Sequence, residues 1–124
     1  MLEDSFEPKK TLWVGTKGGG LNKLNKITRE FEHFTTKDGL IDNTVYGILP
    51  DANNNLWLST NRGISKFNKK TKQFTNFTKA DGLQDDEFNT ASYYRDDRTG
   101  KLYFGGINGI TAFFPNEIKL SDYT

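Results

Sequence analysis

Carboxylates are the most chemically suggestive side chains in the last third of the chain. They form two groups, Asp85-Asp86-Glu87 and Asp96-Asp97. Two acids can hydrolyse a glycosidic bond when they face each other a few ångströms apart across a pocket. The strand pattern described below puts the two groups on connections at opposite ends of their strands. We therefore predict no catalytic pair and no enzymatic activity in this chain.

His33 is the only histidine, and it falls in a predicted strand where the next repeat unit has Asn76. A metal pair needs a second ligand, and a triad or general base needs partners that an isolated histidine lacks. Cysteine is absent, which removes disulfides, thiolate zinc sites and cysteine nucleophiles. We predict that His33 is an ordinary strand residue, either hydrogen-bonded or facing solvent.

Two loops resemble ligand-binding motifs without completing them. Asp51-Ala52-Asn53-Asn54-Asn55 begins like a calcium loop, but Leu56 replaces the required glycine and Arg62 replaces the closing glutamate. Gly18-Gly19-Gly20 lacks the Gly-Lys-Ser/Thr ending of a phosphate loop. We interpret the first as a hairpin turn and the second as a turn with positive φ, and we predict neither a metal nor a cofactor.

The composition points to a strand-rich protein. Aromatic residues make up 14% of the 124 residues, and aromatic side chains favour strands. The net charge of +1 leaves no basic excess for nucleic acid. No apolar run approaches the roughly 18 residues of a membrane span. Met1-Leu2-Glu3-Asp4-Ser5 lacks the basic and apolar regions of a signal peptide, so we expect any export signal to lie elsewhere.

An internal repeat runs through the chain. Leu12-Trp13-Val14-Gly15-Thr16 returns after 44 residues as Leu56-Trp57-Leu58-Ser59-Thr60, and after 46 more as the looser Leu102-Tyr103-Phe104-Gly105-Gly106. Three further markers follow in the same order, namely residues 20–25 with 63–68 and 109–114, 31–34 with 74–77, and 38–40 with 81–83. Four markers in one register, near a period of 44, indicate a repeat architecture.

Each period is predicted to contain four short strands, labelled A to D. In the central unit, A spans about residues 44–49, B 56–60, C 64–68 and D 73–78. The turns between them are rich in Asn, Asp, Gly and Lys, which suit tight connections. No segment keeps a helical period, so we expect little or no helix. Four strands in roughly 44 residues correspond to one blade of a β-propeller.

The B strands support this fold class. Leu12, Trp13 and Val14 are all large, so both faces of the strand are apolar and need covering. Neighbouring blades cover both faces in a propeller. Gly15, Ser59 and Gly105 share one position in the repeat, and we expect this small residue to leave room for an aromatic ring of the next blade.

The predicted fold is an all-β propeller fragment with antiparallel four-stranded blades and just under three blades. We place an incomplete blade at 1–37, with most of strand A missing, a complete blade at 38–80, and a last blade without strand D at 81–124. Closed propellers have about four to eight blades. We therefore predict self-association through the open blade faces or edges.

The markers are similar to the two-component regulator propeller repeat. The resemblance is carried by Leu-Trp-[Val/Leu]-[Gly/Ser]-Thr, Gly-[Leu/Ile]-x-Lys-[Leu/Phe]-Asn, Phe-x-x-Phe and Asp-Gly-Leu. Two stretches look like the last blade of such propellers, residues 82–89 and 104–115. This resemblance implies the periplasmic sensor region of a membrane-bound hybrid histidine kinase, without the kinase itself. It also implies a response to oligosaccharides.

Two other functions stay open beside ligand sensing. The chain could be a protein–protein interaction or dimerisation scaffold with no small ligand. It could also be part of a lyase-like propeller enzyme, since related repeats occur in lyases and fold alone does not decide function.

The predicted ligand surface follows from strand alternation. Because the four strands run alternately up and down, the D–A and B–C connections share one side of the propeller. That side collects polar groups suited to sugar hydroxyls, and Tyr46 and Phe88 lie nearby for stacking. The candidate ligand-binding residues are Lys17, Asp42, Asn43, Asn61, Arg62, Glu87, Asn89 and Asn108, with Asp86 beside them.

Overall fold

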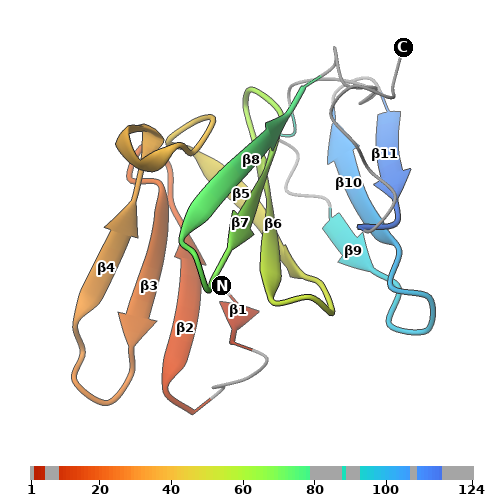
Figure 1. The fold of residues 1–124 in the computed structure, drawn as a ribbon. Coiled ribbons are helices and arrows are strands. Elements are labelled where there is room, and N and C mark those ends of the chain that lie inside the picture. The colour runs from red at the N-terminus through yellow and green to blue at the C-terminus, as the bar shows by residue number, and fades with distance from the viewer. Residues whose placement is uncertain (1, 5–8, 79–87, 89–92, 107–108, 116–124) are drawn as a thin grey trace.

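The chain forms three antiparallel sheets that follow one another in sequence order (Figure 1). The computed structural model describes residues 2–4, 9–78, 88, 93–106 and 109–115. The first sheet has the order β1-β2-β3-β4, the second β5-β6-β7-β8, and the third β9-β10-β11. Each strand pairs with its neighbour in the chain, as expected for propeller blades.

The strands match the predicted units closely. In the central unit, predicted strands A to D correspond to β5 (Val45–Pro50), β6 (Asn55–Thr60), β7 (Ile64–Asn68) and β8 (Gln73–Phe77). The first sheet consists of β1 (Leu2–Glu3), β2 (Thr11–Gly15), β3 (Leu21–Asn25) and β4 (Phe31–Phe34). The third consists of β9 (Tyr93–Arg95), β10 (Leu102–Gly106) and β11 (Gly109–Phe113).

Helix is limited, within the described part, to one turn of 3-10 helix, η1 (Thr36–Asp38). The repeated Asp-Gly-Leu marker explains this turn. Asp38 accepts a hydrogen bond from the Thr35 backbone, Gly39 adopts φ 111°, and Leu40 is buried in the core. The Asp-Gly-Leu sequence therefore specifies a capped turn that is followed by a buried leucine. In the same part of the chain, no helix has the length and apolarity needed to cross a membrane.

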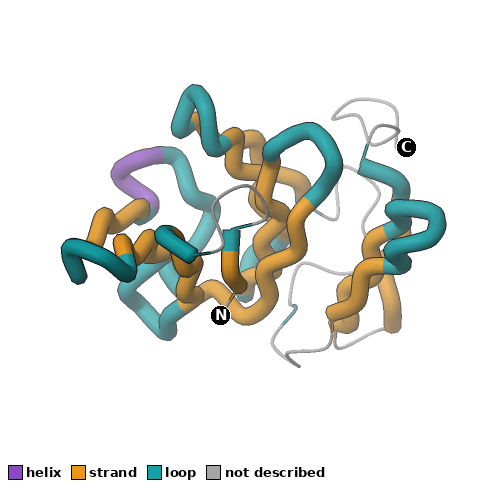
Figure 2. The backbone as a smooth tube through the Cα atoms, turned by 90° about the horizontal axis from the view of Figure 1, so that it is seen from below, coloured by secondary structure: helices purple, strands orange, loops and turns teal. Residues whose placement is uncertain are grey.

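The central B strand, β6, is apolar on both faces because a sheet covers it from each side. Every residue of β6 is buried. Leu56 and Leu58 face the first sheet and join a core cluster with Trp13 and Phe34. Trp57, on the opposite face, joins a second cluster with residues of the third sheet. Figure 2 shows the three groups of strands in a row, with the first and third sheets at opposite ends.

The two junctions between sheets repeat the same contacts. Trp13 of β2 packs edge-on against Phe67 of β7, with ring centroids 5.7 Å apart. Trp57 of β6 packs against Phe113 of β11 at 4.9 Å. A backbone hydrogen bond also recurs, from Val45 N–H to the Thr16 carbonyl (2.8 Å) and from Phe88 N–H to the Thr60 carbonyl (2.9 Å). The ring contact and this hydrogen bond between blades therefore follow the repeat.

The small residue at the end of the B strand does not generally face an aromatic ring, which corrects the prediction. A Cβ at Gly15 would lie 2.7 Å from the carbonyl oxygen of Val45 and 2.9 Å from its Cγ1. At the second junction the ring of Tyr93 approaches Gly47, on the strand paired with Ser59. The space at Gly15 therefore admits the backbone of strand A of the next sheet, which comes closer than a ring would.

Candidate functional site

The loops that carry the predicted ligand-binding residues cluster on one side of the sheets, and we call this cluster the loop face. It consists of the β2–β3 turn (16–20), the connection 35–44 that includes η1, and the β6–β7 turn (61–63), and it lies at the top of Figure 1. Five of the eight predicted residues are on these segments. Glu87, Asn89 and Asn108 lie outside the described residues, as does Asp86.

Asn43 ties two loops of this face together. Its side-chain oxygen accepts a hydrogen bond from Thr36 N–H (2.9 Å), and its carbonyl accepts one from Gly20 N–H (2.7 Å). Gly20 has φ 74°, and a Cβ there would lie 2.1 Å from the Phe34 carbonyl oxygen. The close approach explains the glycine, and the hydrogen bonds give Asn43 a structural role in the loop face.

Asp42, Asn61 and Tyr46 form a second link. Asn61 N–H donates to Asp42 Oδ2 (3.3 Å), and the Tyr46 hydroxyl donates to Asn61 Oδ1 (2.9 Å). Tyr46 lies where the β5–β6 register shifts between Val45 and Gly47. Such an irregularity re-aims a side chain, and here it directs the phenol to the loop face. The link holds three chain segments at one point.

Lys17 and Arg62 differ from these residues because both are exposed. Neither forms an ion pair within the described part of the chain. Their segments are nevertheless held in place, since Gly18 N–H donates to Thr44 Oγ1 (3.1 Å) and Arg62 N–H donates to Thr60 Oγ1 (3.0 Å). The loop face thus presents two cations from ordered turns beside the half-buried carboxylate of Asp42.

Phe88 does not offer a stacking surface, which corrects that prediction. Its side chain is 1% exposed and packs at 6.4 Å against Phe104 of β10. The residue enters the core at the start of the third sheet, where its N–H also completes the repeated junction hydrogen bond. The Phe88 side chain fills space between two sheets. The sequence alone did not distinguish such a core position from an exposed loop position.

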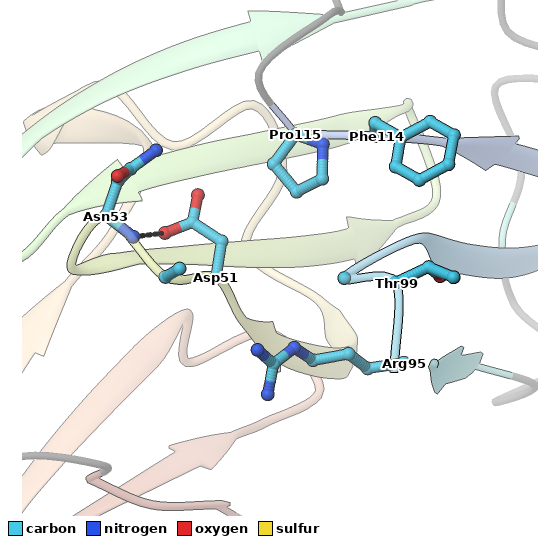
Figure 3. A pocket seen from close by; sticks show the side chains of 8 residues that line it. Asp51, Asn53, Arg95, Thr99, Phe114 and Pro115 are labelled. Carbon is cyan, nitrogen blue, oxygen red and sulfur yellow. Dashed lines mark hydrogen bonds between the residues drawn. The ribbon is translucent and has the colours of Figure 1, made fainter. Parts of the chain in front are cut away.

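The opposite side of the sheets carries a hollow of about 130 Å³. Figure 3 shows Arg95 pointing from the third sheet toward the turn that carries Asp51, with Phe114 and Pro115 across from it. Arg95 Nη1 pairs with Asp97 (3.2 Å), and Arg95 Nε is buried without a hydrogen-bond partner among the described atoms. The hollow is lined by Asp51, Ala52, Asn53, Arg95, Thr99, Gly100, Phe114 and Pro115.

Asp51 organises the β5–β6 hairpin turn through both of its carboxylate oxygens. One carboxylate oxygen accepts the backbone N–H groups of Asn53 (2.8 Å) and Asn55 (3.0 Å). The other accepts Trp57 Nε1–H at 2.8 Å. Asp4 accepts Trp13 Nε1–H in the same way at 2.9 Å. Sequence reasoning missed this Asp–Trp pair, although the aligned Asp4 and Asp51 were a usable signal.

A second hollow, of about 240 Å³, lies against the first sheet. Both positively and negatively charged side chains line this hollow. The lining residues are Lys10, Thr11, Lys23, Asn25, Glu30, Phe31 and Glu32. His33 lies close by on β4, exposed, with its ring stacked on Phe31 (6.1 Å) and Nδ1 in contact with Asn22 Oδ1. His33 is thus an ordinary strand residue, as predicted.

The Asp96 carboxylate is held by hydrogen bonds of its own turn. Asp96 lies in the β9–β10 turn, where the Arg98 backbone N–H donates to it at 2.9 Å. This hydrogen bond, reinforced by Thr99 and the Arg98 charge, holds the pKa of Asp96 below its usual value. Asp85, Asp86 and Glu87 lie outside the described residues. Within the described ones, no group of three metal-ligating side chains is present.

Comparisons with known proteins identify the repeat. Residues 39–62 match the family described as two component regulator propeller. Over 86 residues the chain is 36% identical to Histidine kinase P4 of Formosa agariphila, covering 69% of this chain and 6% of that protein. The chain therefore carries a segment similar to the two-component regulator propeller repeat, and it is similar to a histidine kinase of which it spans only a small part.

Solved structures agree with this relationship. The extracellular domain of a hybrid two component system from B. thetaiotaomicron superposes with a TM-score of 0.75 at 25% identity, over 98% of this chain and 17% of that one. The extracellular domain of a second hybrid system from the same organism gives a TM-score of 0.70 at 21% identity, over 90% and 16%. The second likeness establishes the fold alone, and both support the propeller architecture.

Proposed function

We propose that this chain is a non-catalytic part of a ligand-sensing propeller in an extracytoplasmic, periplasmic receptor of a two-component system, and that it responds to oligosaccharides. The loop face carries the proposal. It combines exposed cations at Lys17 and Arg62 with amide, carboxylate and phenol groups held by hydrogen bonds between loops. Sugar hydroxyls are recognised by such preorganised donors and acceptors around a rigid scaffold.

The relationship to a histidine kinase and to extracellular domains of hybrid systems supports the sensing role and its location. The kinase activity would belong to a longer protein, because the chain spans 6% of the kinase relative. An interaction scaffold without a small ligand is the second candidate. It is favoured by the exposed Tyr94 and Ile110 on the third sheet, which are 62% and 64% exposed.

The test is a titration of the ¹⁵N-labelled chain with defined oligosaccharides of two to six sugars, both neutral and uronic-acid types, followed by amide shifts. We expect shifts at Asn61, Arg62 and Thr44 for at least one probe. Arg62→Ala should weaken that binding roughly tenfold or more, since a hydrogen bond to a charged group contributes about 1.5–3 kcal/mol. Lys70→Ala is the matched control, an exposed cation in the β7–β8 turn at the other end of the strands.

Two results would count against the proposal. Equal weakening by Lys70→Ala would mean that the cations act through general charge and not through a site on the loop face. An absence of shifts with every probe would favour the scaffold without a small ligand.

A further inference from the structure

The two junctions between sheets provide a template, within this chain, for how one blade packs against the next. At both, a B-strand ring inserts against a C-strand ring of the following sheet, Trp13 on Phe67 and Trp57 on Phe113. The first junction adds an ion pair, Asp4 with Lys69 (3.1 Å), whose side chains are 9% and 8% exposed. Asp4 ends strand A of one sheet, and Lys69 follows strand C of the next.

The outer face of the third sheet repeats the inserting half of this template. Tyr103 occupies the register position of Trp13 and Trp57, and its partners Tyr94 and Ala112 point to the same side. Tyr94 and Ile110 are 62% and 64% exposed there. Lys101 lies over the Tyr103 ring at 5.5 Å. We call this surface, consisting of Tyr94, Lys101, Tyr103, Ile110, Ala112 and Phe114, the Tyr103 face.

The outer face of the first sheet repeats the receiving half. Leu24 of β3 occupies the register position of Phe67 and Phe113, and it pairs across the sheet with Leu12 and Phe31. Phe31 is 56% exposed, and Leu12 and Leu24 are half-buried. We call this surface, consisting of Leu12, Val14, Leu24, Phe31 and His33, the Leu24 face. The two faces lie at opposite ends of the row of sheets (Figures 1 and 2).

The charged positions of the template are present at both ends as well. Asp96 ends strand A of the third sheet, as Asp4 ends that of the first. Lys26 follows β3 as Lys69 follows β7. The Arg98 backbone N–H donates to Asp96 at 2.9 Å, and this hydrogen bond lowers the pKa of the Asp96 carboxyl group. Docking one face on the other would bring Lys26 toward Asp96, as Lys69 meets Asp4.

We propose that a second copy of this chain docks head-to-tail, with its Leu24 face on the Tyr103 face, Tyr103 against Leu24 and Asp96 against Lys26. This interface goes beyond the proposed sensing function, because it needs no ligand. It is heterologous, so it either closes into a ring or continues into a chain of copies. Two copies bring together six sheets, within the range of about four to eight blades found in closed propellers.

The test measures solution mass by light scattering coupled to size exclusion over a concentration series. The wild-type chain should form dimers or larger species as concentration rises. Tyr103→Lys blocks one face and Leu24→Lys blocks the other, so each variant alone should elute as a monomer. Their 1:1 mixture retains one intact face from each chain and should give a dimer that grows no further.

A charge reversal gives an independent test that leaves the apolar contact in place. Asp96→Lys and Lys26→Asp should each raise the dissociation constant about tenfold, and the double variant should restore it. Asp97→Lys is the control, because this neighbouring side chain is 88% exposed and matches no template position. Circular dichroism and thermal unfolding establish that each variant is folded.

Three outcomes would overturn the proposal. One is a wild-type chain that stays monomeric at every concentration, which would leave these faces to further blades of a longer chain. Another is association that survives Tyr103→Lys in a folded chain. The third is a mixture of the two blocked variants that remains monomeric.

Discussion

The junction between the first and second sheets differs from the junction between the second and third in its polar parts. Both share the ring-on-ring contact and the backbone hydrogen bond from the following sheet. The first junction adds two ion pairs, Asp4–Lys69 (3.1 Å) and Glu32–Lys72 (2.9 Å). At the second, Pro115 occupies the register position of Lys69, and a hollow lined by Asp51 and Arg95 lies there.

The comparison separates the contacts that occur at both junctions from the contacts that occur at only one. The ring contact recurs at both junctions, and all four of its side chains are buried. The charged contacts are less regular, since the Asp4–Lys69 pair is buried, the Glu32–Lys72 pair is exposed, and Pro115 stands at the Lys69 position of the second junction. The three predictions that follow probe this division, starting with the contact expected to contribute most.

Trp57→Ala should be the most damaging substitution. Trp57 is fully buried, packs against Phe77 (5.6 Å) and Phe113 (4.9 Å), and donates to Asp51. Loss of a buried aromatic side chain costs about 3–5 kcal/mol, measured as the free energy of unfolding in urea. Trp13→Ala is the matched change at the first junction. If the two losses of unfolding free energy differed by more than half of the larger loss, the ring contact would not be the common element of both junctions.

Lys69→Met should come next. The change keeps the apolar stem but leaves the 7%-exposed Asp4 without this cation. Removing one partner of a buried pair costs about 3–5 kcal/mol, and we expect the lower end because both side chains retain slight contact with solvent. Arg95→Met is the control at the second junction, where no direct ion pair to Asp51 is present among the described residues. Equal losses in urea unfolding would contradict the asymmetry between junctions.

Lys72→Ala should have the smallest effect. Its pair with Glu32 is close at 2.9 Å, but the side chains are 53% and 44% exposed. Exposed pairs contribute about 0–1 kcal/mol, and the contribution should shrink further in 0.5 M NaCl because salt screens it. A loss comparable to that of Lys69→Met would show that exposure does not determine which charged contacts matter at this junction.

Much of the candidate site lay beyond sequence reasoning, even though its location was predicted. Strand alternation placed Asp42, Asn43, Asn61 and Arg62 on one side of the sheets, and the structure agrees. It could not tell that Asn43 and Asp42 hold loops together while Lys17 and Arg62 stay exposed. Phe88 was expected at the surface and is buried. Each of these differences depends on the partner that a side chain meets across a sheet junction.

The sequence by itself determined the repeat, the strands and the turns, because these depend on local alternation, on glycine and asparagine in tight turns, and on nearly constant spacing between units. The tertiary structure decided the contacts between units. Gly15 meets the Val45 backbone, and Lys69 reaches Asp4 from 65 residues away. Such contacts are set by the angle and separation of adjacent sheets. No single repeat encodes that geometry, because it emerges only when two apolar faces pack together.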